Sequence, residues 1–193
     1  MSRVVVGIFV GGAGKRMGGV AKGTLLAPAS SETLVERLLR VCAEAAPEAA
    51  LYLVGQSAAY GALELPQLAD DPAEVGPIGG LRSLLAQAKL EGAEQALALA
   101  CDLPFIDAGM LRLLSAPLAA GARAPFVEGR FQPLAAAYAP VPGLAAVDRA
   151  LAQGKYALMR VLEELGTDLE RVDGNAAQTQ ALRDWDTPDD ITR

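Results

Sequence analysis

The residues of this chain best suited to chemistry gather in a glycine-rich stretch near its beginning. Several glycines follow an apolar run directly, and the basic residues Lys15, Arg16 and Lys22 lie among or just after them. Glycines let backbone amide groups approach a ligand closely, and basic side chains beside them balance anionic charge. The pattern is typical of a loop that binds phosphate. A turn that only joins a strand to a helix is the alternative, which the density of glycines and cations disfavours.

Two familiar phosphate-binding loops do not fit this stretch. A Walker P-loop needs Gly-Lys-Ser/Thr, whereas Gly14 and Lys15 are followed by Arg16. The dinucleotide fingerprint Gly-x-Gly-x-x-Gly matches Gly12 and Gly14 but meets Met17 in its last position. A diverged copy of that fingerprint stays an alternative.

Two aspartates follow apolar runs and are further candidates. Asp102 comes directly after residues 95–101, and Asp71 ends the stretch that begins with residues 65–69. A carboxylate at the end of a strand suits Mg²⁺, which keeps most of its waters and shares phosphate oxygens with one or two carboxylates. The alternatives are a helix or turn cap for Asp102 and a solvated acidic loop for Asp71, with Asp70 as a competing match.

Composition excludes several classes of function. The chain has no histidine, so serine or cysteine nucleophiles activated by imidazole and histidine-ligated zinc are excluded. A net charge of −6 argues against nucleic-acid binding, which needs a basic face. Cys42 and Cys101 lack metal-ligand spacing, so we expect a reducing cytoplasm, and no segment has the length of a membrane span.

The elements that must position these residues alternate between strand and helix. Hydrophobic residues make up 52% of 193 positions, enough for one domain over residues 1–193 with its own core. Apolar runs predict strands, and helical spacing predicts helices between them. The predicted strands are 4–10, 50–54, 65–69, 95–101, 123–128, 131–138 and 169–172; the predicted helices are 34–42, 58–64, 81–88, 110–114, 144–153, 157–165 and one beginning near Thr187.

This alternation predicts an α/β fold of three layers, a doubly wound and mostly parallel sheet between helices. Ligands of such sheets bind outside the carboxyl ends of the strands. The glycine-rich stretch, Gln56, Asp71 and Asp102 each follow a predicted strand. We therefore expect them at one edge of the sheet.

The first stretch resembles the opening motif of the nucleoside-triphosphate transferases, and within them the molybdenum cofactor guanylyltransferases. That motif is Leu-Ala-Gly-Gly-x-x-x-Arg-Met-Gly followed by a lysine, and residues 9–18 give Phe-Val-Gly-Gly-Ala-Gly-Lys-Arg-Met-Gly, with Lys22 at the lysine position. Residues 101–105, Cys-Asp-Leu-Pro-Phe, resemble the second motif, and residues 76–81 resemble the Gly-Pro-Leu-Ala-Gly turn that follows an aspartate. The resemblance covers nearly the whole chain and implies a Rossmann-like nucleotidyltransferase fold.

The resemblance also implies roles for single residues. Arg16, Lys22 and Asp102 take the catalytic positions, and Asp102 takes the place of the metal ligand for Mg²⁺. The nucleotide-binding positions correspond to Phe9, Val10, Gly11, Gly12, Lys22, Asp71 and Asp102. Lysines usually lie on the surface without a ligand, so an ordinary exposed lysine is the alternative for Lys22.

The second half of the chain, which the resemblance assigns to the acceptor, departs from the family pattern. Gln132 replaces a histidine of a His-Pro-Leu strand, and Lys155 stands where arginines often follow a glycine. Asp186 replaces the asparagine of an Asn-Thr-Pro motif, and Asp-Thr-Pro is familiar among the related cytidylyltransferases. The motifs are therefore divided between GTP and CTP as the substrate.

The activity that the resemblance implies is transfer of GMP from GTP to the terminal phosphate of molybdopterin, with release of pyrophosphate. Transient contact with molybdoenzymes or other cofactor-biosynthesis proteins would follow. The alternatives are a nucleotidyltransferase that uses CTP or a sugar phosphate, and a nucleotide-binding adaptor that delivers cofactor without catalysis. A Rossmann-type oxidoreductase is disfavoured, because the second predicted strand ends in Gly55-Gln56 and not in an acidic residue for the ribose.

Overall fold

The computed structural model describes residues 3–11 and 21–185, and its centre is a sheet whose first half is wholly parallel. Strand β1 (Val4–Phe9) lies between β2 (Ala50–Val54) and β4 (Gln95–Ala100), and the short β3 (Gln67–Leu68) pairs with β2. All three pairings are parallel. The carboxyl ends of β1, β2, β3 and β4 therefore meet at one edge, as the sequence predicts.

The second half of the sheet contains the antiparallel strands. Strand β7 (Ala135–Tyr138) lies antiparallel between β4 and β5 (Ala122–Val127), and β5 also pairs with β6 (Arg130–Phe131) and in parallel with β8 (Leu169–Asp173). The strand predicted over residues 131–138 is therefore two strands. The chain leaves β5 after a hairpin and returns beside β4, where the small side chains of β7 are buried.

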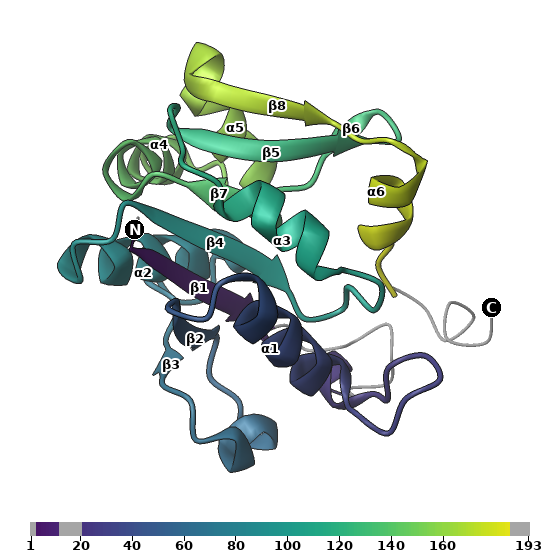
Figure 1. Cartoon of the computed structure of the whole chain (residues 1–193). Helices are drawn as coiled ribbons and strands as arrows, with labels where there is room; N and C mark the ends of the chain where they lie inside the picture. Colours follow the sequence, from purple (N-terminus) through teal and green to yellow (C-terminus); the bar gives the residue numbers. More distant parts are fainter. Residues whose placement is uncertain (1–2, 12–20, 186–193) are drawn as a thin grey trace.

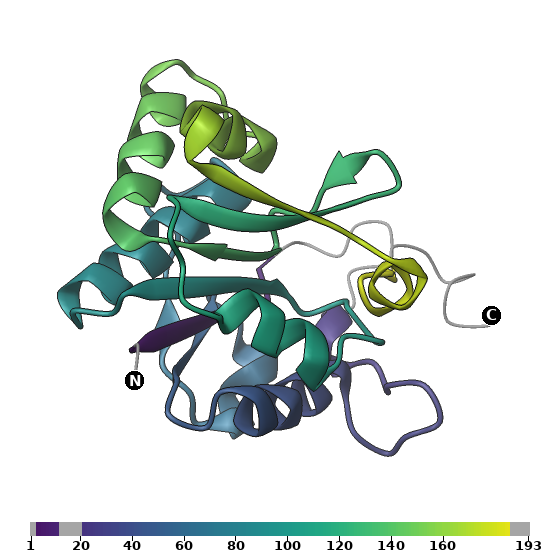
Figure 2. The same ribbon diagram turned by 45° about the horizontal axis from the view of Figure 1, so that its top comes forward.

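Helices cover both faces of the sheet and form the outer layers (Figures 1 and 2). One face carries α1 (Leu34–Ala45) and α3 (Ala108–Ser115), and the other carries α2 (Pro77–Leu90), α4 (Pro140–Ala152) and α5 (Leu158–Leu165). Side chains of β1 alternate between the two cores: Val6 and Ile8 pack with α1 and α3, whereas Val5 and Phe9 pack with α2. Because both faces are covered, the strand is apolar throughout. The predicted three-layer, mostly parallel α/β fold is confirmed.

The helix boundaries follow local chemistry. Thr33 forms a capping box with Glu36 at the start of α1, and the Asp107 side chain accepts a hydrogen bond from the amide of Met110 at the start of α3. Pro140 occupies the first turn of α4, so this helix begins before the predicted residue 144.

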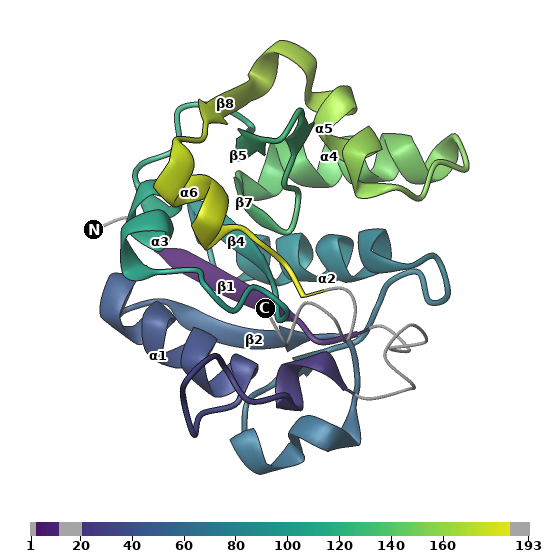
Figure 3. The same ribbon diagram turned by 90° about the vertical axis from the view of Figure 1, so that its right-hand side faces the viewer.

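One helix is absent from the sequence prediction. Helix α6 (Ala176–Ala181) is capped by Asn175 and lies beside α3 in Figure 3. The helix predicted from Thr187 lies outside the described residues. In the described part of the chain, no helix is both long and apolar enough to span a bilayer.

Candidate functional site

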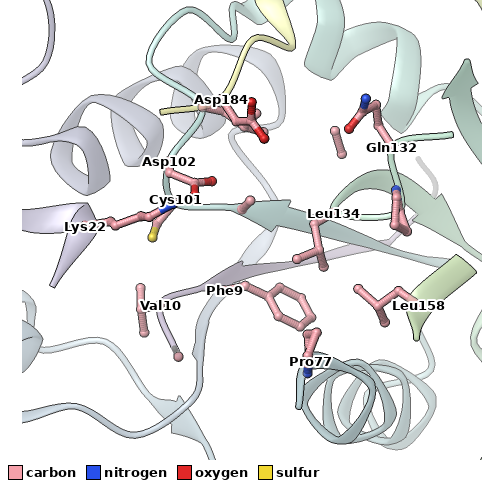
Figure 4. A pocket seen from close by; sticks show the side chains of 15 residues that line it. Phe9, Val10, Lys22, Pro77, Cys101, Asp102, Gln132, Leu134, Leu158 and Asp184 are labelled. Atoms are coloured by element: carbon pink, nitrogen blue, oxygen red, sulfur yellow. Dashed lines mark hydrogen bonds and ion pairs between the residues drawn. The ribbon is translucent and has the colours of Figure 1, made fainter. Parts of the chain in front are cut away.

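The carboxyl ends of β1 and β4 open into a cavity of about 400 Å³. Its lining comes from both halves of the chain: Phe9, Val10, Gly11, Lys22, Pro77, Ala100, Cys101, Asp102, Leu103, Gln132, Pro133, Leu134, Ala135, Leu158 and Asp184. Figure 4 shows Phe9, Leu134 and Leu158 grouped on one side, with Lys22, Asp102 and Asp184 on another. The cavity therefore offers an apolar surface for a ring and a charged end for a polyanion or a cation.

The charged end is built around one ion pair. Lys22 Nζ lies 2.8 Å from Asp102 Oδ2, and each side chain keeps about a fifth of its surface exposed. Lys22 begins a 3₁₀ turn (Lys22–Thr24), and Asp102 follows β4. The fold thus brings together two residues 80 positions apart that the sequence analysis selects as catalytic.

The thiol of Cys101 lies beside this pair. Burial raises the pKa of Cys101 to about 12, and the neighbouring Asp102 carboxylate adds to the increase while Lys22 opposes it. The thiol therefore stays protonated at neutral pH and is no nucleophile. Cys42 and Cys101 are both free and buried.

The backbone amides just after β1 already form hydrogen bonds within the sheet. The amides of Val10 and Gly11 both donate to the carbonyl of Val54, at 2.9 and 3.2 Å. Neither amide is directed at the cavity as a phosphate donor, so contact here would come from carbonyl oxygens or from packing. A side-chain carbon at Gly55, whose φ is +97°, would lie 2.7 Å from the Gly11 backbone. The segments that follow β1 and β2 are therefore so close together that only glycine fits at position 55.

Asp70 and Asp71 face different surroundings. Asp71 is exposed and forms an ion pair with Arg82 of α2, which also binds Asp148 of α4 at 2.8 Å. Asp70 is half-buried, and burial raises the pKa of its carboxyl. A side-chain carbon added to Gly80 would meet Asp70 Oδ1 at 3.0 Å and the Phe9 ring at 3.1 Å, so Asp70 lies near the ring of Phe9, a residue that lines the cavity. Neither aspartate lines the cavity, and the predicted nucleotide contact of Asp71 stays a prediction.

Asp184 is a cavity residue that the sequence analysis does not select. It lines the cavity because the amide of Trp185 donates to the carbonyl of Asp102 at 3.0 Å, and the indole packs edge-on against Phe105. Trp185 is buried with Ala27 and Leu34. A lone tryptophan between two acidic residues, Asp184 and Asp186, was the available signal, because such a large apolar side chain is rarely left exposed.

A second cavity of about 370 Å³ adjoins the first. The two share Gln132, Pro133 and Asp184, and the second is further lined by Phe126, Gly129, Arg130, Phe131 and Met159. The Phe126 and Phe131 rings stack edge-on at 4.9 Å, and the Arg171 guanidinium lies 3.8 Å above the centre of Phe126. Gln132, the residue in the family's histidine position, therefore lies between the cavities, whereas Lys155 is exposed and lines neither.

The donor set at the first cavity fits Mg²⁺. Among residues 3–11 and 21–185, no group of three or more histidine, cysteine or acidic side chains is arranged around a common point. Mg²⁺ does not need one, because waters and substrate phosphates complete a shell begun by one or two carboxylates. Asp102 and Asp184 line one cavity and supply such carboxylates.

Two of the predicted site residues, Gly12 and Arg16, lie outside the described residues, as does Asp186. The other predicted site residues are described. Of these, Phe9, Val10, Gly11, Lys22 and Asp102 line the first cavity together.

Comparison with known proteins gives the same answer as the motifs. Residues 6–170 match the MobA-like NTP transferase domain. The chain is 31% identical over 161 residues to a probable molybdenum cofactor guanylyltransferase of Opitutus terrae, covering 82% of this chain and 77% of that one. It is 30% identical over 161 residues to a molybdenum cofactor guanylyltransferase of Acidiphilium cryptum, covering 82% and 79%.

A solved structure shares the fold. The molybdopterin-guanine dinucleotide biosynthesis protein A of Archaeoglobus fulgidus superposes with a TM-score of 0.74 at 22% identity, covering 97% of this chain and 94% of that one. In this fold the cavity lies at the carboxyl ends of β1 and β4, the edge of a parallel sheet where ligands generally bind. The chain is therefore a transferase of the MobA-like NTP transferase domain family.

Proposed function

We propose that this protein transfers GMP from GTP to the terminal phosphate of molybdopterin and releases pyrophosphate, with Mg²⁺ as cofactor. The observation that carries the proposal is the Lys22–Asp102 pair at the charged end of a cavity formed by β1 and β4. The names of the relatives from Opitutus terrae and Acidiphilium cryptum support the guanylyl activity and the acceptor.

The reaction suits a chain without histidine. A phosphate oxygen of the acceptor, already ionised near neutral pH, attacks the α-phosphorus of GTP. The bond from that phosphorus to the bridging oxygen breaks, and pyrophosphate leaves with the electron pair. No side chain has to remove a proton, so the protein acts by positioning and by balancing charge.

The charged residues divide this work. Lys22 would contact the phosphates of GTP, and its ammonium would balance the charge that develops on the leaving pyrophosphate. Asp102 would hold Mg²⁺, with Asp184 adding a second carboxylate on the same cavity. When bound, Mg²⁺ neutralises phosphate oxygens and aligns the triphosphate. Arg16 is proposed to assist Lys22.

The two cavities suit the two substrates. The first, with Phe9, Val10 and Gly11 in its wall, would take the nucleotide, and Asp71 would contact it from the neighbouring loop. The second would take the acceptor, because the rings of Phe126 and Phe131 suit a flat pterin and Arg130 suits an anion. Gln132 lies where they join, so the acceptor phosphate would meet the nucleotide there.

We further propose that the base is guanine. Guanine presents N1–H and an amino group as donors, and carbonyl oxygens at the β1 end can accept from them: that of Val10, and the second lone pair of Phe9, whose carbonyl also accepts from the Cys101 amide at 3.2 Å. A pocket built for these donors leaves acceptors unpaired with cytosine, at roughly 1–3 kcal/mol for each buried group. Two such groups give a preference for GTP on the order of 10²-fold in kcat/KM.

The test is pyrophosphate release with molybdopterin as acceptor and GTP, CTP, ATP or UTP as donor, with and without Mg²⁺. The proposal expects turnover with GTP that is lost on chelation of the metal. Because Asp186 resembles the cytidylyl pattern, equal or better kcat/KM with CTP would move the protein to that activity. Tight nucleotide binding with no pyrophosphate release would instead favour the adaptor.

A further inference from the structure

A buried tyrosine lies behind the Lys22–Asp102 pair. Tyr60 is only 2% exposed and belongs to a 3₁₀ segment (Ala58–Leu63) between β2 and β3. It lines neither cavity, so it touches no substrate in the proposed reaction. Its side chain nonetheless packs with both chain segments that carry the ion pair.

The first segment is the turn that begins with Lys22. The amide of Gly23 donates a hydrogen bond of 3.1 Å to the Tyr60 hydroxyl oxygen, in a buried environment. A side-chain carbon at Gly23 would lie 2.8 Å from that oxygen and 3.0 Å from the ring, so the turn rests directly on the tyrosine. This contact fixes the backbone next to Lys22.

The second segment is the end of β4. Tyr60 is buried in the same apolar cluster as Cys101 and Leu103, at the end of that strand. Cys101 immediately precedes Asp102. Tyr60 therefore binds the residue after Lys22 and shares a buried cluster with the residue before Asp102.

We propose that Tyr60 is a positioning residue that holds the turn of Lys22 at the correct distance from Asp102. The turn Lys22–Thr24 has no side-chain cap of its own, so its position depends on contacts such as this one. Without the hydroxyl, the Gly23 amide loses its buried acceptor and the turn shifts to find another. The ammonium of a displaced Lys22 would no longer lie where the phosphates of GTP carry their negative charge.

The kinetic test compares Tyr60→Phe with Tyr52→Phe. Tyr52 also loses a hydroxyl that binds Glu91 and Gln87, but it lines neither cavity and lies along β2 away from the carboxyl edge. Because the inference rests on the proposed function, wild-type transfer with GTP and Mg²⁺ is measured first. Tyr60→Phe is expected to lower kcat about tenfold and to raise the Mg²⁺ concentration for half-maximal rate, with the KM for molybdopterin unchanged. Tyr52→Phe is expected to leave all three unchanged.

A second test does not depend on activity. Tyr60→Phe and Lys22→Met are combined in a double-mutant cycle of urea unfolding. If Tyr60 holds Lys22 on Asp102, the Lys22 substitution costs less once the hydroxyl is gone, and the folding equilibrium constants depart from additivity by about twofold or more. Gly23→Ala, which pushes on the hydroxyl from the other side, is expected to give the same loss of kcat.

The outcomes separate the two proposals. A wild-type protein that transfers nothing from GTP overturns the proposed function, and the unfolding cycle still decides the role of Tyr60. Additive unfolding effects, or a Tyr60→Phe enzyme with wild-type kcat and Mg²⁺ dependence, overturn the positioning role. The intrinsic fluorescence of Trp185, the single tryptophan, whose amide binds the carbonyl of Asp102, reports in each variant whether this edge of the sheet stays folded.

Discussion

Two cations of this molecule sit in partly buried ion pairs and differ in what else they contact. Arg123 of β5 is 8% exposed in its side chain and binds Glu170 of β8 at 2.8 Å. It also donates to carbonyl oxygens at the end of α3 and just beyond it, at 2.8 Å to Ala116 and 3.0 Å to Pro117. Lys22 pairs with Asp102 at the same distance of 2.8 Å, but both side chains line a cavity.

The difference distinguishes a charge that stabilises the fold from a charge pair that we propose acts on substrate. The Arg123 guanidinium satisfies carbonyls that the last turn of α3 leaves unpaired, so its removal leaves buried acceptors without donors. The Lys22–Asp102 pair faces a space that a triphosphate and a metal can enter. Burial of an ion pair is therefore no sign of function by itself; the position of both charges on a shared cavity is.

The largest effect is expected for Asp102→Asn. Asparagine keeps the size and one acceptor oxygen but loses the charge that holds a hard cation. We expect transfer to fall by about 10³-fold, while the melting temperature changes little because the side chain is partly solvated. Pyrophosphate release across a Mg²⁺ titration checks this. Turnover within a few-fold of wild type would make Asp102 a cap. The Lys22–Asp102 pair would then be structural, like the Arg123–Glu170 pair.

The opposite result is expected for Arg123→Met. The substitution keeps much of the apolar stem but leaves Glu170 and several carbonyls without their donor. We expect a loss of about 3 kcal/mol in the free energy of unfolding and unchanged kcat for the folded fraction. Urea denaturation measures the first and active-site-normalised turnover the second. Arg112→Met is the matched control, because Arg112 pairs with Glu44 where both side chains are 55% exposed, and such a pair contributes little.

The sequence predicts the parallel half of the sheet well and the antiparallel half less well. Strands β1, β2 and β4 are apolar runs covered on both faces, and this composition is itself the signal. The hairpin of β5 and β6 is also predicted, with Gly129 in its turn at φ +79°. β7 still pairs with β5, and its second pairing, with β4, is decided by tertiary packing, which local sequence does not encode.

The same contrast holds for helices and for the site. Helix α6 has the sequence Ala-Ala-Gln-Thr-Gln-Ala, which lacks an apolar stripe, and its evidence is the capping pair Asn175 and Gln178. Lys22 and Asp102 were predictable because each belongs to a motif next to a strand. For Asp184 the lone tryptophan beside it indicated burial only, because a long-range bond from Trp185 to Asp102 places Asp184 on the cavity. The choice between Asp70 and Asp71 depends on the direction of each side chain. The sequence does not give that direction for two adjacent aspartates.

A smaller effect than that of Asp102 is expected for Lys22→Met. Methionine keeps the length of the side chain and removes the ammonium that would balance phosphate charge. We expect kcat/KM for GTP to fall on the order of 10²-fold, with the KM for the acceptor unchanged. Lys89→Met, at the exposed last turn of α2, serves as the control. An equal effect of both lysines would mean that only the overall charge of the protein matters.

The smallest effect is expected at an exposed cation of the second cavity. Arg130 lies on the β6 hairpin and is exposed, so any contact with an anionic acceptor is screened. We expect Arg130→Gln to raise the KM for molybdopterin by about fivefold or less, to leave the KM for GTP unchanged and to leave stability unchanged. Initial rates at saturating GTP with varied acceptor, and at saturating acceptor with varied GTP, separate the two KM values.

Arg160→Gln is the control, since Arg160 pairs with Glu163 on the exposed face of α5 and lines neither cavity. An effect of Arg130→Gln on GTP alone would assign the second cavity to the nucleotide, because a charge acts first on the anion that lies nearest to it.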